Sequence, residues 1–244
     1  SSAFPGDTIA SYSWQIGNAI PSQSSQANPV ATFQTLDTSI VELITITVHG
    51  CTDTMFKSIV VSANPDAGFI LPNACAGAVI NILNSTTIQP SGENISYSWT
   101  IPGASITAST DVNPAISYST EGTYNVSLIA RADGGCSDTA LHTLNVYPLP
   151  QTSFAAPAIC KNNSVSLQNN SFVNDDSIQF YYWSFPQGQP SISQAMEPSV
   201  SFDTAGTFLI TLVSETQHGC KDTANGSLRV YDLPQVRIEN PDSG

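Results

Sequence analysis

Charge is scarce in this sequence, and positive charge is scarcest. Charged residues make up 10% of the 244 residues, and six Lys and Arg face 19 Asp and Glu, for a formal net charge of −13. Such a chain repels phosphate backbones and anionic lipid surfaces. No apolar run approaches the roughly 18 residues that a membrane-spanning helix needs. We therefore expect neither nucleic acid as a partner nor insertion into a membrane.

Motifs of catalysis and metal binding are missing as well. The sequence contains no G-x-S-x-G, no Gly-rich phosphate loop and no H-E-x-x-H. It also lacks C-x-x-C, the spacing of many zinc sites, and D-x-D-x-D, the pattern of many calcium loops. Asp66 and Asp232 stand alone, so a calcium site has little support, because calcium takes six or more oxygen ligands. We expect no enzyme, no metal and no cofactor.

What the sequence does contain is a tandem repeat. Trp14, Trp99 and Trp183 are separated by 85 and 84 residues. The same steps relate three further landmarks: Cys51, Cys136 and Cys220; the prolines Pro29, Pro114 and Pro198; and the pairs Asp53-Thr54, Asp138-Thr139 and Asp222-Thr223. Shared spacing of independent landmarks predicts an array of similar units. We expect units at 1–65, 66–149 and 150–233, with the start of a fourth at 234–244. The histidines vary freely between copies, since His49 and His218 correspond to Gly134, which favours solvated residues over catalytic bases.

Two more cysteines, Cys75 and Cys160, precede the tryptophans of the second and third units. The cysteines could be buried thiols of a cytosolic protein, or they could form one disulfide within each unit. The intervals of 61 and 60 residues favour the disulfides Cys75–Cys136 and Cys160–Cys220, and with them an oxidising compartment. Counting back one repeat step of 85 residues from Cys75 places the partner of Cys51 ten residues before the numbering reaches zero. We therefore expect the first unit to lack its opening strand and Cys51 to be unpaired because of truncation.

Each unit has the pattern of a β-sandwich. Side chains alternate in Tyr124-x-Val126-x-Leu128 and in its copy Phe208-x-Ile210-x-Leu212, and no segment has a sustained helical period. Several short strands with a central tryptophan predict an antiparallel sandwich of immunoglobulin-like type. The linkers at 64–68, 147–151 and 231–235 are short and contain proline, which makes stiff spacers. The predicted fold is all-β: tandem sandwiches arranged as a rod.

These landmarks resemble the PKD (polycystic kidney disease) domain. The second unit carries Tyr97-Ser98-Trp99, Asn113-Pro114 and the run from Gly122 to Leu128, and the other units match less fully. The usual W-D-F-G-D-G turn is replaced by WTIPGAS, so any role of its aspartates is not carried over.

The cysteines and the YPLPQ linkers are similar to PKD-like repeats of large secreted surface proteins of Bacteroidota, including gliding-motility adhesins and other cargo of the type IX secretion system. The resemblance implies an extracellular or cell-surface location. It implies as partners the neighbouring repeats and the machinery of secretion and attachment, with polysaccharides or other surface proteins as further partners.

A triplet of Asp, Ser or Thr, and an apolar residue or alanine recurs in the chain. It resembles the acceptor sequence for O-glycosylation in Bacteroidota, which implies glycans on Thr8, Thr54, Thr139, Ser177, Thr204 and Thr223. In the alternative interpretation, the triplet begins a strand after a turn, and its carboxylate accepts hydrogen bonds from nearby backbone N–H groups.

The third unit has two extra aromatics, Phe180 and Tyr182, where the second has Ser96 and Ser98. They point away from Trp183 and could stack on sugar rings or a protein partner. The other interpretation, which we favour, is that a long loop or the neighbouring unit covers them. The leading functional hypothesis is a non-enzymatic structural or adhesive stalk. The alternative is a set of carbohydrate- or protein-binding accessory repeats of a secreted hydrolase.

Overall fold

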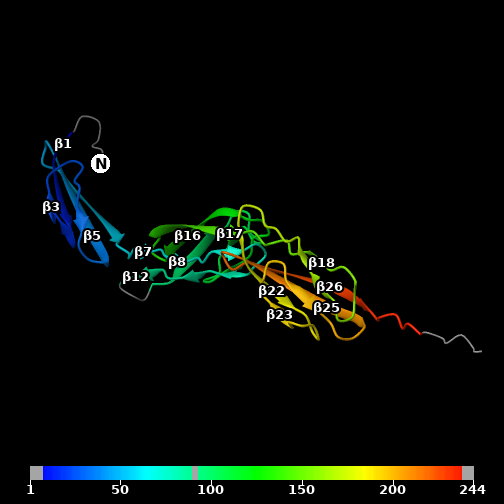
Figure 1. Ribbon diagram of the computed structural model, residues 1–244. Coiled ribbons are helices and arrows are strands. Elements are labelled where there is room, and N and C mark those ends of the chain that lie inside the picture. Colours follow the sequence, from blue (N-terminus) through cyan, green and yellow to red (C-terminus); the bar gives the residue numbers. More distant parts are fainter. Residues whose placement is uncertain (1–7, 90–92, 238–244) are drawn as a thin grey trace, which may run out of the picture.

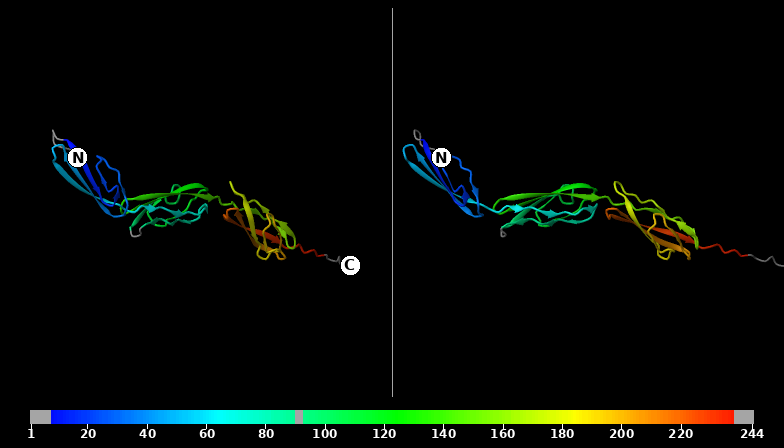
Figure 2. Two further views of the ribbon diagram at one scale, coloured as in Figure 1. Left: turned by 90° about the vertical axis from the view of Figure 1, so that its left-hand side faces the viewer. Right: turned by 60° about the vertical axis from the view of Figure 1, so that its left-hand side comes forward.

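The computed structural model describes residues 8–89 and 93–237, and every regular element in that part is a β-strand. Three units follow one another along an elongated chain, with the first inclined to the other two (Figures 1 and 2). Unit 1 holds β1 to β6, unit 2 holds β7 to β17, and unit 3 holds β18 to β26. The predicted fold class, tandem immunoglobulin-like sandwiches arranged as a rod, is confirmed. In the predicted fourth segment, residues 238–244 lie outside the described residues.

Unit 2 is a two-layer sandwich. One layer is a five-stranded sheet in the order β14-β13-β16-β17-β9, and the other consists of the antiparallel pairs β8–β11 and β10–β15. A further pair, β7–β12, lies at the entry from unit 1. The strands are β7 (Pro65–Asp66), β8 (Phe69–Ile70), β9 (Ala74–Cys75), β10 (Ile80–Asn81), β11 (Leu83–Asn84), β12 (Thr87–Ile88), β13 (Ile95–Thr100), β14 (Ala108–Ser109), β15 (Ala115–Ile116), β16 (Gly122–Ala132) and β17 (Ser137–Tyr147).

Unit 3 repeats this arrangement. Its main sheet has the order β19-β26-β25-β22-β23, and the pairs β18–β21 and β20–β24 face it. The strands are β18 (Phe154–Ala155), β19 (Ile159–Cys160), β20 (Ser164–Ser166), β21 (Gln168–Asn169), β22 (Ile178–Ser184), β23 (Ile192–Ser193), β24 (Ser199–Ser201), β25 (Gly206–Thr216) and β26 (Lys221–Tyr231).

Unit 1 has the main sheet in the order β3-β1-β5-β6, with a small β2–β4 pair beside it. Its strands are β1 (Ile9–Ile16), β2 (Ala19–Ile20), β3 (Gln23–Ser24), β4 (Thr32–Phe33), β5 (Thr38–Thr47) and β6 (Thr52–Val60). In its described residues no strand pair corresponds to β8–β11. An apolar groove of about 360 Å³, lined by Trp14, Phe33, Val41 and Ile59 among others, is therefore open.

The tryptophans hold the same place in all three units. The indole Nε1 of each donates a hydrogen bond to the backbone carbonyl twelve residues further on, at 2.9 Å for Trp14, 2.8 Å for Trp99 and 3.0 Å for Trp183. In units 2 and 3 a phenylalanine packs edge-on against the indole, Phe69 at 5.0 Å and Phe154 at 5.2 Å between ring centroids. This pair closes the core between the two layers, and both tryptophans are buried.

Two features of each sandwich determine which residues lie at a junction between units. The first is the long hairpin of the main sheet, whose turn lies at the end of the unit that faces the preceding unit. The glycine before the cysteine of this turn has a positive φ in all three units, +79° at Gly50, +90° at Gly135 and +80° at Gly219. A side chain at those positions would strain the turn. At the opposite end, β9 and β19 lie parallel to the last residues of β17 and β26.

Candidate functional site: the junction between units 2 and 3

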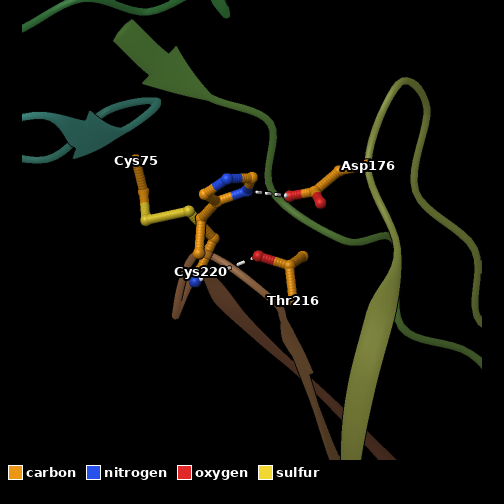
Figure 3. The surroundings of a disulfide bond; sticks show 5 residues. Cys75, Asp176, Thr216 and Cys220 are labelled. Carbon is orange, nitrogen blue, oxygen red and sulfur yellow. Dashed lines mark hydrogen bonds and ion pairs between the residues drawn. A yellow bond between two sulfur atoms is a disulfide. The ribbon is translucent and has the colours of Figure 1, made fainter.

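A disulfide joins units 2 and 3. Cys75 on β9 is bonded to Cys220 in the β25–β26 hairpin, with Cα atoms 5.6 Å apart (Figure 3). Cys220 is buried, and its backbone N–H donates to the side-chain hydroxyl of Thr216. The remaining cysteines, Cys51, Cys136 and Cys160, are free thiols. The bond therefore connects two domains and leaves each domain without an internal bridge.

The predicted pairs Cys75–Cys136 and Cys160–Cys220 are wrong. Cys75 lies in register with Tyr147 at the end of β17, whereas Cys136 precedes the first residue of that strand. A strand of 11 residues is roughly 35 Å long at about 3.3 Å per residue, and disulfide Cα atoms must lie within about 7 Å. The two cysteines of one unit thus sit at opposite ends of it, and each faces a neighbouring unit. Cys51 is free as predicted, but a missing partner within its own unit is not the reason.

An aromatic contact lies beside the disulfide. The imidazole of His218 stacks on the ring of Tyr147, with centroids 3.7 Å apart and planes 8° apart. The Nδ1 atom of His218 is 3.1 Å from Oδ2 of Asp176, whose side chain is only 1% exposed. Tyr147 ends unit 2, while the other two residues belong to unit 3. The interface therefore combines a covalent bond, a ring stack and a buried carboxylate.

The carboxyl of Asp176 has a pKa below its usual range. Burial alone raises this pKa, because it disfavours the charged form, but several hydrogen bonds oppose that effect. They come from His218, the backbone N–H of Ser177 and the side chains of Gln217 and Thr216, and together they lower the pKa. Asp176 is consequently ionised at neutral pH and helps hold the β25–β26 hairpin in place.

Each linker is also hydrogen-bonded to the hairpin of the unit that it enters. The backbone N–H of Ala67 donates to Oδ2 of Asp138 at 2.8 Å, and that of Thr152 donates to Oδ2 of Asp222 at 2.8 Å. The bond from Ala67, with a second from the N–H of Thr139, lowers the pKa of Asp138. These aspartates are the first residues of two predicted glycosylation triplets. The backbone hydrogen bonds expected in the alternative interpretation are thus present.

The junction between units 1 and 2 has smaller side chains at the same positions. Ser62 and Gly134 occupy the repeat positions of Tyr147 and His218, and a Cβ on Gly134 would overlap the Oγ and Cβ of Ser62. The carboxylate of Glu93 accepts a hydrogen bond from the N–H of Ala63 at 3.3 Å. The Cys136 thiol lies 3.8 Å from the carbonyl of Ser62. This junction is close-packed without a disulfide or a ring stack.

The proposed glycan acceptors all lie at the surface. Each hydroxyl-bearing residue of the triplets is exposed: Thr8, Thr54, Thr139, Ser177, Thr204 and Thr223. Asp7, which begins the first triplet, lies outside the described residues. The backbone N–H groups of Thr54 and Ser177 donate to the carboxylates of the preceding aspartates, at 2.9 and 2.7 Å. Exposure leaves these hydroxyls accessible, and modification stays a prediction.

Phe180 and Tyr182 are exposed, at 47% and 36%. The expectation that a loop or the neighbouring unit covers them is wrong. Their ring centroids are 6.3 Å apart, and the ammonium of Lys221 lies 5.8 Å from the centroid of Tyr182. The pKa of Tyr182 is raised, first by its hydrogen bond to Glu215 and then by burial and the charge of Glu215. The pair forms a small apolar surface with a charged edge.

Over residues 8–89 and 93–237, no group of three or more His, Cys, Asp and Glu side chains could hold a metal ion. Asp66 and Asp232 lie far apart along the chain, and Asp232 forms an ion pair with Lys161 at 2.6 Å. In the same part of the chain no helix is long and apolar enough to cross a membrane.

Sequence reasoning missed the cluster of Tyr147, His218 and Asp176. The histidine looked dispensable because Gly134 replaces it in unit 2. The sequence did contain a usable signal. Where His218 is replaced by Gly134, the repeat position of Tyr147 is also replaced, by Ser62. Paired changes of this kind indicate contact, here between different units.

The fold and the junctions define a class, that of tandem immunoglobulin-like β-sandwich domains. Within it, residues 62–146 match the model of the PKD domain, which confirms the predicted resemblance over unit 2. No curated protein matches the chain.

Several solved structures are similar. The PKD1 domain of Vibrio anguillarum Epp is 28% identical over 34% of this chain and 93% of that one, with a TM-score of 0.30. The three N-terminal domains of the bacteriophage RB49 highly immunogenic outer capsid protein are 8% identical, over 96% and 92% of the chains, with a TM-score of 0.44. A 1.5-MDa bacterial ice-binding adhesin is 13% identical, over 94% and 88%, with a TM-score of 0.36.

Proposed function

We propose that this chain is a non-enzymatic structural segment of a secreted or cell-surface protein, a stalk that holds other parts away from a surface. The observation that carries this proposal is the junction between units 2 and 3, where a disulfide, a ring stack and a linker hydrogen bond fix two sandwiches end to end. A rod serves as a spacer only if its joints resist bending. The disulfide also favours an oxidising compartment outside the cytosol.

Stiffness at this joint is the property to measure. Paramagnetic or fluorescent labels on units 2 and 3 of the full chain should give a narrow distance distribution, and the distribution should broaden when Cys220→Ser removes the bridge. Small-angle scattering should give the elongated profile of a rod. A compact profile, or a broad distance distribution with the bridge intact, would contradict the stalk.

The finer assignment that we propose is a stalk of a Bacteroidota surface protein exported by the type IX system, such as a gliding-motility adhesin. Its support is the resemblance of the cysteines and YPLPQ-type linkers to such repeats. In the native host, antibody against these units should label intact cells, and a strain without the secretion system should lose that labelling. Labelling that persists in that strain would remove the assignment.

Glycans on the six exposed hydroxyls belong to the same proposal. Intact mass of the protein from its native host should exceed the sequence mass by hexose-type increments. Material whose mass equals that of the bare chain would exclude the modification.

A second candidate function rests on the exposed pair Phe180 and Tyr182. Rings at the surface can stack on sugar faces, as expected of a binding repeat attached to a secreted hydrolase. Polysaccharide binding should then fall at least tenfold when both residues are changed to Ser, their counterparts in unit 2. The matched control is Phe172→Ser, another exposed aromatic of unit 3. Equal binding by all three proteins would exclude this function.

A further inference from the structure

A row of four side chains crosses the main sheet of unit 1 from one edge strand to the other. The register places Gln23 of β3 opposite Gln15 of β1. It also places Glu42 of β5 between Gln15 and Phe56 of β6. Residues directly opposite one another in antiparallel strands share a face, with Cβ atoms about 5 Å apart. The four side chains line a hollow of about 400 Å³, a size typical of small-ligand sites.

The row lies on the outer face of the sheet, which carries no second layer in any unit. Gln15 follows Trp14 on β1, so the two side chains point to opposite faces. In unit 2 the second layer packs on the tryptophan side, where Phe69 contacts Trp99, and unit 3 repeats that contact. Leu141, which holds the position of Phe56 in unit 2, is 65% exposed. The exposure of the row is therefore a property of this sheet face.

The composition of the row distinguishes unit 1 from the other units. The same row consists of Ala108, Thr100, Ser127 and Leu141 in unit 2, and of Ile192, Ser184, Thr211 and Asn225 in unit 3. In unit 3 the hydroxyl of Thr211 donates to the side-chain oxygen of Asn225 at 2.8 Å, so the sheet satisfies its own polar groups. Over the described part of the chain, no hydrogen bond or ion pair engages the side chains of Gln15, Gln23 or Glu42. These groups are free to contact a ligand.

The hollow combines a negative charge with an open ring face. Glu42 is half-buried and ionised at neutral pH, whereas Phe56 is 64% exposed. None of the described residues that line the hollow is basic, and Lys57, next to Phe56 on β6, points to the opposite face. The whole chain carries a formal charge of −13. A cation is therefore attracted to this hollow, and it would gain both an ion pair and a cation–π contact.

We propose that the hollow binds an arginine side chain of a partner protein. A guanidinium has five N–H donors in a planar fork, so it can bind the Glu42 carboxylate through two hydrogen bonds and lie flat on the ring of Phe56. The amide oxygens of Gln15 and Gln23 accept the N–H groups that remain. The argument for this occupant is charge complementarity, since an uncharged ligand would leave Glu42 without a counter-charge. The site is independent of the exposed aromatic pair of unit 3.

The test compares two peptides that differ in one charge. NMR spectra of the isotope-labelled full chain are recorded during titration with the peptide Gly-Ser-Arg-Ser-Gly, and again with citrulline in place of arginine. Citrulline keeps the shape of the side chain but is neutral. We expect the backbone amides of Gln15, Glu42 and Phe56 to shift, and the arginine peptide to bind about tenfold more tightly than the citrulline peptide. Added salt should reduce this difference.

Variants of the row assign the binding to its side chains. Glu42→Gln should lower the affinity for the arginine peptide about tenfold, and Phe56→Leu, which installs the residue of unit 2, should lower it about two- to fivefold. Glu121→Gln, at an exposed carboxylate of unit 2, should leave the affinity unchanged. Urea unfolding of each variant reports whether unit 1 is still folded. If Glu42→Gln unfolds it, the comparison of the two peptides on the parent chain decides.

Several outcomes would overturn the proposal. They are equal affinity for the two peptides, shifts confined to units 2 and 3, no shift at millimolar peptide, and an affinity that a folded Glu42→Gln protein retains. Maltotriose serves as a neutral sugar probe. If it shifts the same amides and binds more tightly than the arginine peptide, the hollow is a sugar site and the arginine assignment is wrong.

Discussion

The imidazole of His218 lies flat on the phenol ring of Tyr147, 3.7 Å away, although the two residues come from different sandwiches. The contact sits beside the Cys75–Cys220 disulfide and so lies where two units are already held together. Covalent and aromatic contacts thus act on the same joint.

The ring pair should stabilise the joint measurably. In a double-mutant cycle with Tyr147→Ala and His218→Ala, measured by urea unfolding of the full chain, we expect a coupling free energy of about 0.5–1.5 kcal/mol. Leu209→Ala, an exposed position elsewhere on unit 3, should show no coupling to Tyr147→Ala. Coupling no larger than that of the Leu209 control would mean that the stack contributes nothing.

Acid should weaken the joint. The folded-state pKa of Asp176 lies below its ordinary value of 3.8, so its stabilising effect is present above about pH 4 and is lost as the pH falls through the folded pKa. The melting temperature of unit 3 should therefore drop between about pH 4 and pH 2. Asp176→Asn should be less stable at pH 7 and should lose part of this drop. An unchanged acid response in Asp176→Asn would refute the assignment to this carboxyl.

Thiol titration distinguishes the two disulfide schemes directly. Unfolded under non-reducing conditions, the chain should react with three equivalents of a thiol reagent, at Cys51, Cys136 and Cys160. The pairs Cys75–Cys136 and Cys160–Cys220 would leave a single reactive thiol. Peptide mapping after blocking of the free thiols should recover Cys75 linked to Cys220.

The first junction should depend on the absence of a side chain at Gly134. Gly134→Ala places a methyl group where Ser62 lies, so we expect a loss of about 1–3 kcal/mol or a change in the angle between units 1 and 2. Ser62→Gly should be nearly neutral alone and should rescue Gly134→Ala, as judged by thermal unfolding and scattering. If Gly134→Ala is as stable as the parent, with the same scattering profile, the close approach is not real.

Phe69 should contribute strongly to the stability of unit 2. It is 3% exposed and packs edge-on against Trp99, so Phe69→Ala should cost unit 2 about 3–5 kcal/mol in urea unfolding. Phe172→Ala, at an exposed site, should change stability by less than about 0.5 kcal/mol. Similar losses for both would show that the Phe69–Trp99 pair is not the centre of the core.

The strand pattern was accessible from sequence because it is local and repeated. Alternation in Tyr124-x-Val126-x-Leu128 reports directly which side chains face the core, and three copies of Trp at one spacing give the array. The long hairpin strands β16 and β25 fall where that alternation is strongest.

The disulfide partner was not accessible in the same way. Within-unit and between-unit pairs repeat with the same period, so spacing cannot separate them. The pairing depends on the end of the sandwich at which each cysteine lies. For Cys75 this end is set by β9, which lies parallel to the last residues of β17. Asp176 was missed for a similar reason, because 42 residues separate it from His218 and only the folded hairpin brings the two together.

The position of the Cys75–Cys220 bond changes how tension would pass through the chain. A pull on the two ends of the chain runs through β7, β8 and β9 of unit 2, crosses the sulfur atoms to Cys220 and continues into β26 of unit 3, so residues 76–219 lie outside the loaded path. Residues 76–219 could then unfold under load without lengthening the molecule, and the disulfide would limit how far the chain extends.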